Sequence, residues 1–238
     1  RERHRGGRGA RRASGSGAAQ LTTQVRTIDS SELSDWIVCK DLGFLKSREH
    51  SAEVTDYFRR EVDLERTWGA FDGERVVGTL RTFPTSLTVP GAARVGVSAM
   101  TNVTVSPTHT RRGLLTQMIT GELTASLERG EAVSILIASE FPIYGRYGCG
   151  AAVDSASYTI EADAARFLEP GEGTIELVDF DTFRKEGPGV YEAYHAVQPG
   201  SIGRDDHWWD RRLGMVRAPG DEPPKGYCAV YRNESGVT

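Results

Sequence analysis

The segment VTVSPTHTRRGLLT (residues 103–116) joins a strand pattern to a helical pattern through a loop with two arginines and a glycine. A helix N-terminus presents unpaired N–H groups and the positive end of the helix dipole, which favours a phosphate there. Gly113 lets the backbone approach an anion closely, and Arg111 and Arg112 add charge and bidentate hydrogen bonds. The segment predicts either a pyrophosphate-binding loop or a surface loop with solvated arginines.

The sequence upstream of this segment predicts a strand, two helices and a run of antiparallel strands. Asp72-Gly73-Glu74 separates two apolar runs, which is a strong hairpin signal. The predicted elements are a strand at 24–28, a helix capped by Ser30 or Ser31 that runs through Leu42, a short helix at 51–60, strands at 66–71 and 75–83, a turn at Pro90-Gly91 and a strand at 100–106.

Downstream, apolar residues recur at helical spacing from Leu114 to Leu127, and Gly130 closes the helix. The apolar run VSILIAS (133–139) predicts a strand buried on both faces. A turn-rich segment at 140–150 precedes a strand expected at 152–162. The order of elements indicates an α/β fold with a mixed sheet.

Composition divides the chain into three parts. Residues 1–20 are basic and rich in Gly, Ser and Ala, so we predict a disordered tail. Residues 21–162 form the first domain. Residues 163–238, with strand patterns at 175–180 and 227–232 and a helical stretch at 190–197, are expected to be the beginning of a second, incomplete domain.

Charge is distributed unevenly. The net charge is −4, but residues 1–12 hold six arginines and one glutamate, which leaves −9 on the remainder. This acidic remainder fits a cationic partner, or simply solubility. The total charge disfavours nucleic-acid binding, even through the Arg-rich tail. Three scattered cysteines give no metal site, no apolar run predicts a membrane span, and we expect a cytoplasmic protein.

Four separated blocks, taken in order, resemble the GNAT superfamily and most closely its Eis-type (enhanced intracellular survival) N-acetyltransferases. The blocks are VTV (103–105), RRGLLT (111–116), ILIASE (135–140) and IYGRYG (143–148). The resemblance covers residues 24–232 and implies a GNAT fold followed by an incomplete second GNAT-like domain. It also implies direct acetyl transfer from acetyl-CoA, without a metal, to a primary amine of an aminoglycoside, a polyamine or a lysine side chain.

The resemblance assigns roles to individual residues. Tyr144 would be the general acid that protonates the departing CoA thiolate. The strand at 103–105 would pair with the pantetheine amides, the loop would wrap the pyrophosphate, and two further residues would lie near the acetyl group. These cofactor-binding residues are Val103, Thr104, Val105, Arg111, Arg112, Gly113, Leu114, Leu115, Thr116, Ser139 and Glu140.

Several of these side chains also have a purely structural interpretation. Tyr144 could be a packing wedge, and Tyr147 is a rival acid for which packing is the favoured role. His109 is expected to pack within its turn, since no partner for catalysis adjoins it in sequence. Cys149 is interpreted as a small apolar residue, and Trp208-Trp209 as a packing pair.

The resemblance also has implications for the C-terminal part of Eis-type proteins. Eis-type proteins continue through a second GNAT-like domain, form hexamers and use their terminal carboxylate as the general base, a role that we do not expect Thr238 to fill. We therefore expect this chain to bind acetyl-CoA weakly or to be inactive. The alternative function is a degenerate GNAT module that binds CoA or a protein partner without turnover.

Overall fold

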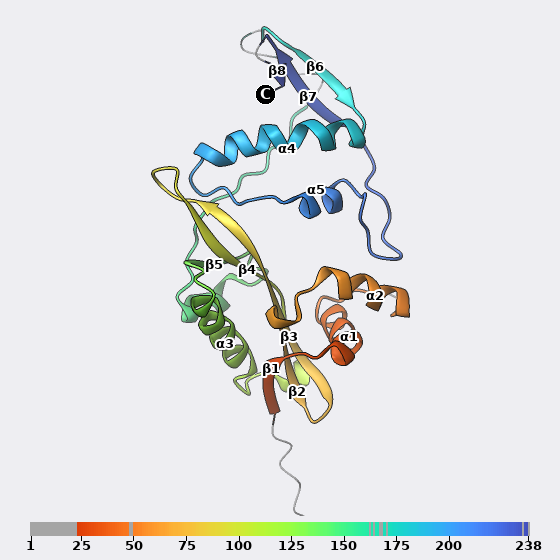
Figure 1. The fold of residues 1–238 in the computed structure, drawn as a ribbon, viewed down its shortest axis with the longest axis vertical. Helices are drawn as coiled ribbons and strands as arrows, with labels where there is room; N and C mark the ends of the chain where they lie inside the picture. Colours follow the sequence, from red (N-terminus) through yellow and green to blue (C-terminus); the bar gives the residue numbers. More distant parts are fainter. Residues whose placement is uncertain are drawn as a thin grey trace, which may run out of the picture.

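The computed structural model describes residues 23–47, 50–161, 163, 165–166, 169, 171–234 and 236–237, so the predicted tail at 1–20 lies outside it. Five strands form the main sheet in the order β1-β2-β3-β4-β5 (Figure 1). The strands are β1 (Thr23–Thr27), β2 (Thr67–Asp72), β3 (Arg75–Thr88), β4 (Arg94–Val105) and β5 (Val133–Leu136). Neighbours are antiparallel except β4 and β5, which are parallel. The predicted mixed α/β architecture is confirmed.

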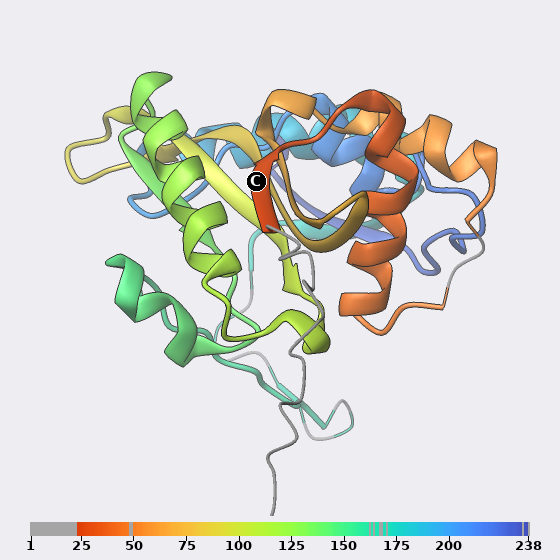
Figure 2. The same ribbon diagram turned by 90° about the horizontal axis from the view of Figure 1, so that it is seen from below.

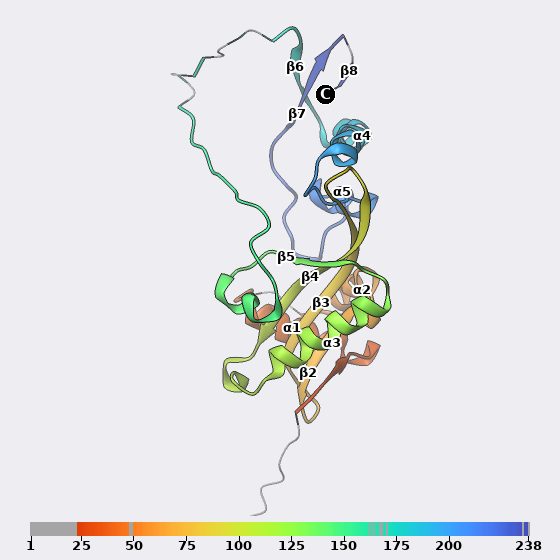
Figure 3. The same cartoon turned by 90° about the vertical axis from the view of Figure 1, so that its left-hand side faces the viewer.

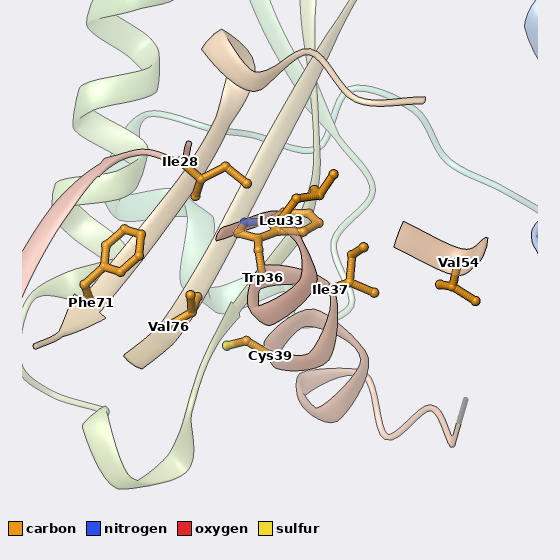
Figure 4. Close-up of a cluster of buried hydrophobic side chains, with 8 residues drawn as sticks. All are labelled: Ile28, Leu33, Trp36, Ile37, Cys39, Val54, Phe71 and Val76. Atoms are coloured by element: carbon orange, nitrogen blue, oxygen red, sulfur yellow. The ribbon is translucent and has the colours of Figure 1, made fainter. Parts of the chain in front are cut away.

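Helices cover both faces of this sheet (Figure 2). They are α1 (Leu33–Gly43) and α2 (Ala52–Glu61) on one face and α3 (Leu114–Glu128) on the other. Because side chains alternate along a strand, Phe71 packs against α1 while its neighbour Ala70 packs against α3. Figure 4 shows the α1 side of the core, where the fully buried Trp36 also donates from its indole to the Trp68 carbonyl at 2.8 Å.

The starts of α1 and α2 follow local capping rules. Ser51 caps α2, as expected, by accepting from the Val54 N–H at 3.4 Å. The turn of 3-10 helix η1 (Ser30–Glu32) leads into α1, and here Asp29 takes the cap position expected of Ser30 or Ser31. The Glu32 carboxylate accepts from the Asp29 N–H at 2.8 Å, which completes a reciprocal cap.

Four strand predictions were wrong in detail. β3 and β4 are longer than expected and meet in a hairpin whose tip includes Ala92 at φ 60°. β5 ends at Leu136 and its residues are exposed or half-buried, because no described strand pairs with its outer edge. The strand expected at 152–162 is absent over 152–161, which is exposed and irregular (Figure 3).

The later residues form a second, smaller unit. Its sheet has the order β6-β7-β8, made of β6 (Thr174–Val178), β7 (Cys228–Asn233) and β8 (Gly236–Val237). The helices are α4 (Phe180–Val197) and α5 (Asp206–Arg212). α4 begins ten residues earlier than expected, since Asp179 caps it at 2.7 Å and Pro188 is tolerated inside it. The division into domains at 162/163 stays a prediction.

The two units are joined along the part of β3 beyond Arg81, where β2 no longer pairs with it. The Thr88 N–H donates to the Ser201 carbonyl at 3.1 Å, and the Gly203 N–H donates to the Ser86 carbonyl at 2.8 Å. His195 of α4 is 1% exposed beside these contacts and hydrogen-bonds the Ser86 hydroxyl at 3.1 Å. The β3–β4 hairpin is therefore fixed against α4.

Candidate active site

β4 separates from β5 halfway along its length. The two strands pair only from Val97 to Met100. A bulge follows, where Asn102 adopts φ 56° and its carbonyl accepts from the Thr79 hydroxyl at 2.7 Å. Within the described chain, no strand pairs with the outer edge of residues 101–105. Backbone N–H and C=O groups on that edge are available to an extended ligand.

The loop after β4 concentrates backbone donors at the start of α3. Arg111 at φ 62° and Gly113 at φ 75° both adopt left-handed conformations, and Gly113 is the N-cap of α3. Turns that mix right- and left-handed residues point successive N–H groups into one concavity, which binds anions. The loop can therefore present several N–H groups to one phosphate.

His109 anchors this loop from behind. It lies in the 3-10 turn η3 (Pro107–His109) and is 6% exposed. Its Nε2 lies 2.9 Å from the Asp72 carboxylate at the end of β2, and its Nδ1 lies 2.8 Å from the Thr108 hydroxyl. Both ring nitrogens are thus engaged, as the packing interpretation of this residue expected.

A cleft of about 800 Å³ joins the opened strand, the loop and the segment after β5. It is lined by ten of the eleven residues expected to bind the cofactor, namely Val103, Thr104, Val105, Arg111, Gly113, Leu114, Leu115, Thr116, Ser139 and Glu140. Arg112 is the exception. Its side chain is exposed and donates to the Thr108 carbonyl at 3.3 Å.

Tyr144 lines the same cleft from the 3-10 helix η4 (Phe141–Tyr147). Its ring packs against the α3 side of the core. Burial raises the pKa of its phenol, and the nearby Cys149, Glu140 and Tyr147 act in the same direction. No hydrogen-bond partner for the hydroxyl exists in the part of the chain that the structure describes. The phenol is therefore kept protonated and free to donate.

Tyr147 differs from Tyr144 in just this respect. Its hydroxyl lies 3.0 Å from the Thr116 hydroxyl, which ties η4 to the first turn of α3. This contact agrees with the packing role favoured for Tyr147. Trp208 and Trp209 also pack as expected, edge to face at 5.0 Å between ring centroids.

Sequence reasoning missed other residues that line the cleft, among them Phe44, Phe83, Asn102, Ile143 and Arg146. It also missed Gly43, the last residue of α1. A Cβ at Gly43 would lie 2.1 Å from the Thr104 Oγ1, so only glycine permits this approach of α1 to β4. A glycine that ends a helix was the available signal, but capping explains such a residue equally well.

An opened mixed sheet beside an amide-rich helix start is the arrangement of an acyltransferase fold. The model of the acetyltransferase (GNAT) domain matches residues 24–152, more than half of the chain, so the chain belongs to the GNAT acetyltransferase family. The structure adds that, among described residues, no group of three potential ligands could hold a metal ion and no helix has the length and apolarity to cross a membrane.

Among GNAT acetyltransferases, individual relatives of this chain include Eis-type proteins. An uncharacterized N-acetyltransferase of Streptomyces avermitilis is 47% identical over 221 residues, which cover 89% of this chain and 52% of the relative. N-acetyltransferase Eis of Mycobacterium tuberculosis is 35% identical over 178 residues, which cover 69% of this chain and 44% of the relative. The crystal structure of Eis1 from Mycobacterium abscessus matches with a TM-score of 0.72 at 32% identity and covers 91% of this chain and 52% of that one.

These likenesses confirm the expected GNAT fold and the resemblance to Eis-type proteins. The chain spans about half the length of the curated relatives that it matches.

Proposed function

We propose that this chain carries the acetyl-CoA site of an N-acetyltransferase that transfers the acetyl group directly to a primary amine. The observation that carries the proposal is the juxtaposition, in one cleft, of the unpaired edge of residues 101–105 and the Arg111–Gly113 loop. An extended ligand with amides at one end and a pyrophosphate at the other needs both features. Acetyl-CoA is such a ligand, and the family supports it.

Each part of the cleft then has one task. The β4 edge orients the pantetheine arm by pairing with its amides. The loop N–H groups and Arg111 hold the pyrophosphate charge. Bound acetyl-CoA supplies the acetyl group as an activated thioester. Fixing that thioester beside the acceptor amine accounts for much of the expected rate.

Tyr144 provides the proton. Its hydroxyl is not committed to another residue, and its raised pKa keeps the phenol neutral well above neutral pH. We assign it as the general acid that protonates the CoA sulfur as the thiolate leaves. Ser139 and Glu140 lie on the same wall, and we place them near the acetyl group.

The acceptor class follows from charge. The −9 balance of residues 13–238 supports an amine that is cationic in solution, such as an aminoglycoside, a polyamine or a lysine side chain. A hexameric assembly stays a prediction, which sedimentation of the full-length protein can test.

Calorimetry with acetyl-CoA and a thiol-release assay with a broad amine panel test the proposal together. Binding with product formation is the expected result for the full-length protein. Binding without product for any amine would favour the alternative of a degenerate module. Absence of binding at millimolar acetyl-CoA would overturn both assignments.

A further inference from the structure

A second cleft of about 780 Å³ lies between the β3–β4 hairpin and the segment that carries α4 and α5. Its volume lies within the range of about 300–1,000 Å³ that small-molecule sites occupy. It adjoins the first cleft, since Phe83 lines both, and Ile202 of the first cleft is followed directly by Gly203 of the second. A ligand in one cleft can therefore extend into the other.

The charge of this second cleft is opposite to that of the chain. Five arginines and three carboxylates line it, which leaves +2 with both lining histidines counted as neutral, whereas the chain carries −4. The charged residues are Arg81, Arg94, Arg204, Arg211, Arg212, Glu61, Glu192 and Asp205. A local excess of positive charge in a concave site attracts anions even on an acidic protein.

The three carboxylates are already occupied. Glu61 accepts from His207 at 2.7 Å and from Arg211 at 3.4 Å. Asp205 caps α5 by accepting from the Trp208 N–H at 2.7 Å. Glu192 pairs with Arg94 at the rim. Each carboxylate already has a partner, and the charge of Glu61 also acts on Arg81 without forming an ion pair with it.

Three arginines consequently have no ion-pair partner in the described part of the chain: Arg81, Arg204 and Arg212. Arg81 donates only to the backbone carbonyl of Glu61, at 3.2 Å, and its Nε is buried without an acceptor. Burial and the neighbouring charge of Arg211 lower the pKa of Arg81, while Glu61 and Tyr57 oppose this shift only in part. A guanidinium in these surroundings is stabilised by any anion that enters the cleft.

Aromatic rings orient the second of these arginines and form an apolar wall. The Arg204 guanidinium lies 3.6 Å from the centroid of the Tyr191 ring and 4.3 Å from that of Trp208. Stacking fixes the plane of a guanidinium and leaves its edge N–H groups free for a carboxylate. Phe83, which is 41% exposed, faces the same cleft and can contact the apolar body of a ligand.

We propose that the second cleft binds the carboxylate of an acceptor that carries an amine at one end and an acid at the other. Arg81, Arg204 and Arg212 hold the carboxylate, and the chain of the acceptor passes Phe83 so that its amine enters the first cleft. The identification of the ligand as the acceptor rests on the proposed function. The proposal that the cleft binds an anion is independent of that function. A polyamine, which is cationic throughout, is disfavoured at this second cleft.

The test compares 6-aminohexanoate with 6-aminohexanamide, which share length and amine and differ in the carboxylate. An NMR titration that follows the Trp208 indole signal, assigned with Trp208→Phe, gives both affinities. We expect the carboxylate compound to bind about tenfold more tightly or better, as a charge-assisted contact predicts. Arg81→Gln and Arg212→Gln should each reduce that ratio to about threefold or less.

Arg60→Gln is the matched control, because Arg60 is exposed on α2 and lines neither cleft. If Arg81→Gln does not fold, the exposed Arg212 still carries the test. Equal affinity for the two compounds, or equal loss in Arg60→Gln, would overturn the proposal. Calorimetry with acetyl-CoA on the same samples distinguishes the proposed function from the anion site. If acetyl-CoA does not bind but the preference for the carboxylate compound persists, the proposed function is wrong and the anion site stands.

Discussion

The indole N–H of Trp68 on β2 donates to the Glu122 carboxylate of α3 at 2.7 Å, across 54 positions of sequence. Glu122 is fully buried and also accepts from the hydroxyls of Thr82, Ser98 and Ser126, and it pairs with Arg129. Four elements of the sequence thus converge on one carboxylate. Since the start of α3 carries the candidate phosphate loop, this contact fixes that loop relative to the sheet.

Removing the Glu122 charge should destabilise the protein. We expect Glu122→Gln to lower the free energy of unfolding by about 2–3 kcal/mol, somewhat below the ~3–5 kcal/mol of breaking a buried pair, because Gln keeps one acceptor. Glu128→Gln, at an exposed site on the same helix, should change it by less than about 0.5 kcal/mol. Urea unfolding measures both. A loss no larger than that of the control would show that Glu122 is not the central contact.

Tyr144→Phe should impair chemistry without impairing binding. If Tyr144 donates the proton, thiol release by the full-length enzyme falls by about 10²-fold or more while the Kd for acetyl-CoA is unchanged. Tyr147→Phe is the matched control, because it removes a phenol from the same turn whose hydroxyl is bound to Thr116. Its rate should stay within about threefold of the parent, the cost of one neutral hydrogen bond. Undiminished turnover in Tyr144→Phe would contradict the assignment.

Gly113 and Gly130 form a matched pair for testing the loop. Both have φ 75°, and an added Cβ would meet open space at Gly130 and only the Gln117 side chain at 3.9 Å at Gly113. Alanine at either position costs about 1–2 kcal/mol of stability through left-handed strain. Only Gly113→Ala should also weaken acetyl-CoA binding, by about tenfold, because it disturbs the N–H groups that face the phosphates. Calorimetry measures the affinity of both variants for acetyl-CoA. Equal affinities would contradict phosphate binding by the loop.

Stability should depend on the ionisation of His195. Burial and the charge of Arg94 lower the pKa of this histidine, with Glu192 opposing, and its other neighbours are the hydroxyls of Ser86, Thr88 and Ser201. A lowered pKa means that the stabilisation is complete above the unfolded-state value of about 6.5 and is lost as pH falls through the folded-state value.

The melting temperature should therefore decrease as the pH is lowered from 7.5 to 5.5. His195→Gln should make that decrease smaller. His50→Gln serves as the control, because His50 contacts Asp41 away from this interface. An unchanged pH dependence in His195→Gln would rule out this histidine as the source.

Local sequence signals predicted much of the fold. The Asp72-Gly73 turn gave the β2–β3 hairpin and the apolar spacing from Leu114 gave α3, because turn chemistry and helical periodicity are encoded within a few residues. The strand expected at 152–162 failed for the opposite reason. Its alternating pattern is correct for a strand, but strand formation requires a partner edge, and none of the described strands pairs with it.

In the candidate site too, the features encoded in short segments were predicted and those that depend on tertiary structure were not. The loop and Tyr144 could be placed by motif, since each occupies a short contiguous segment. Arg112 could not be separated from Arg111, because the left-handed turn that sends their side chains apart leaves no mark in the sequence. The second cleft was beyond prediction as well, because Arg81 and Arg204 come to line one cleft only through the docking of residues 200–203 on β3.

That docking has a practical consequence for anyone who wishes to shorten the protein. A fragment that stops at residue 162 would leave Thr88 and Ser86 with backbone groups that Ser201 and Gly203 now satisfy, on an open strand edge beside the hairpin. Unsatisfied edges recruit other strands, so such a fragment invites self-association. Truncations that keep the chain through α5 retain the native cover and are the safer starting point for crystallisation or labelling.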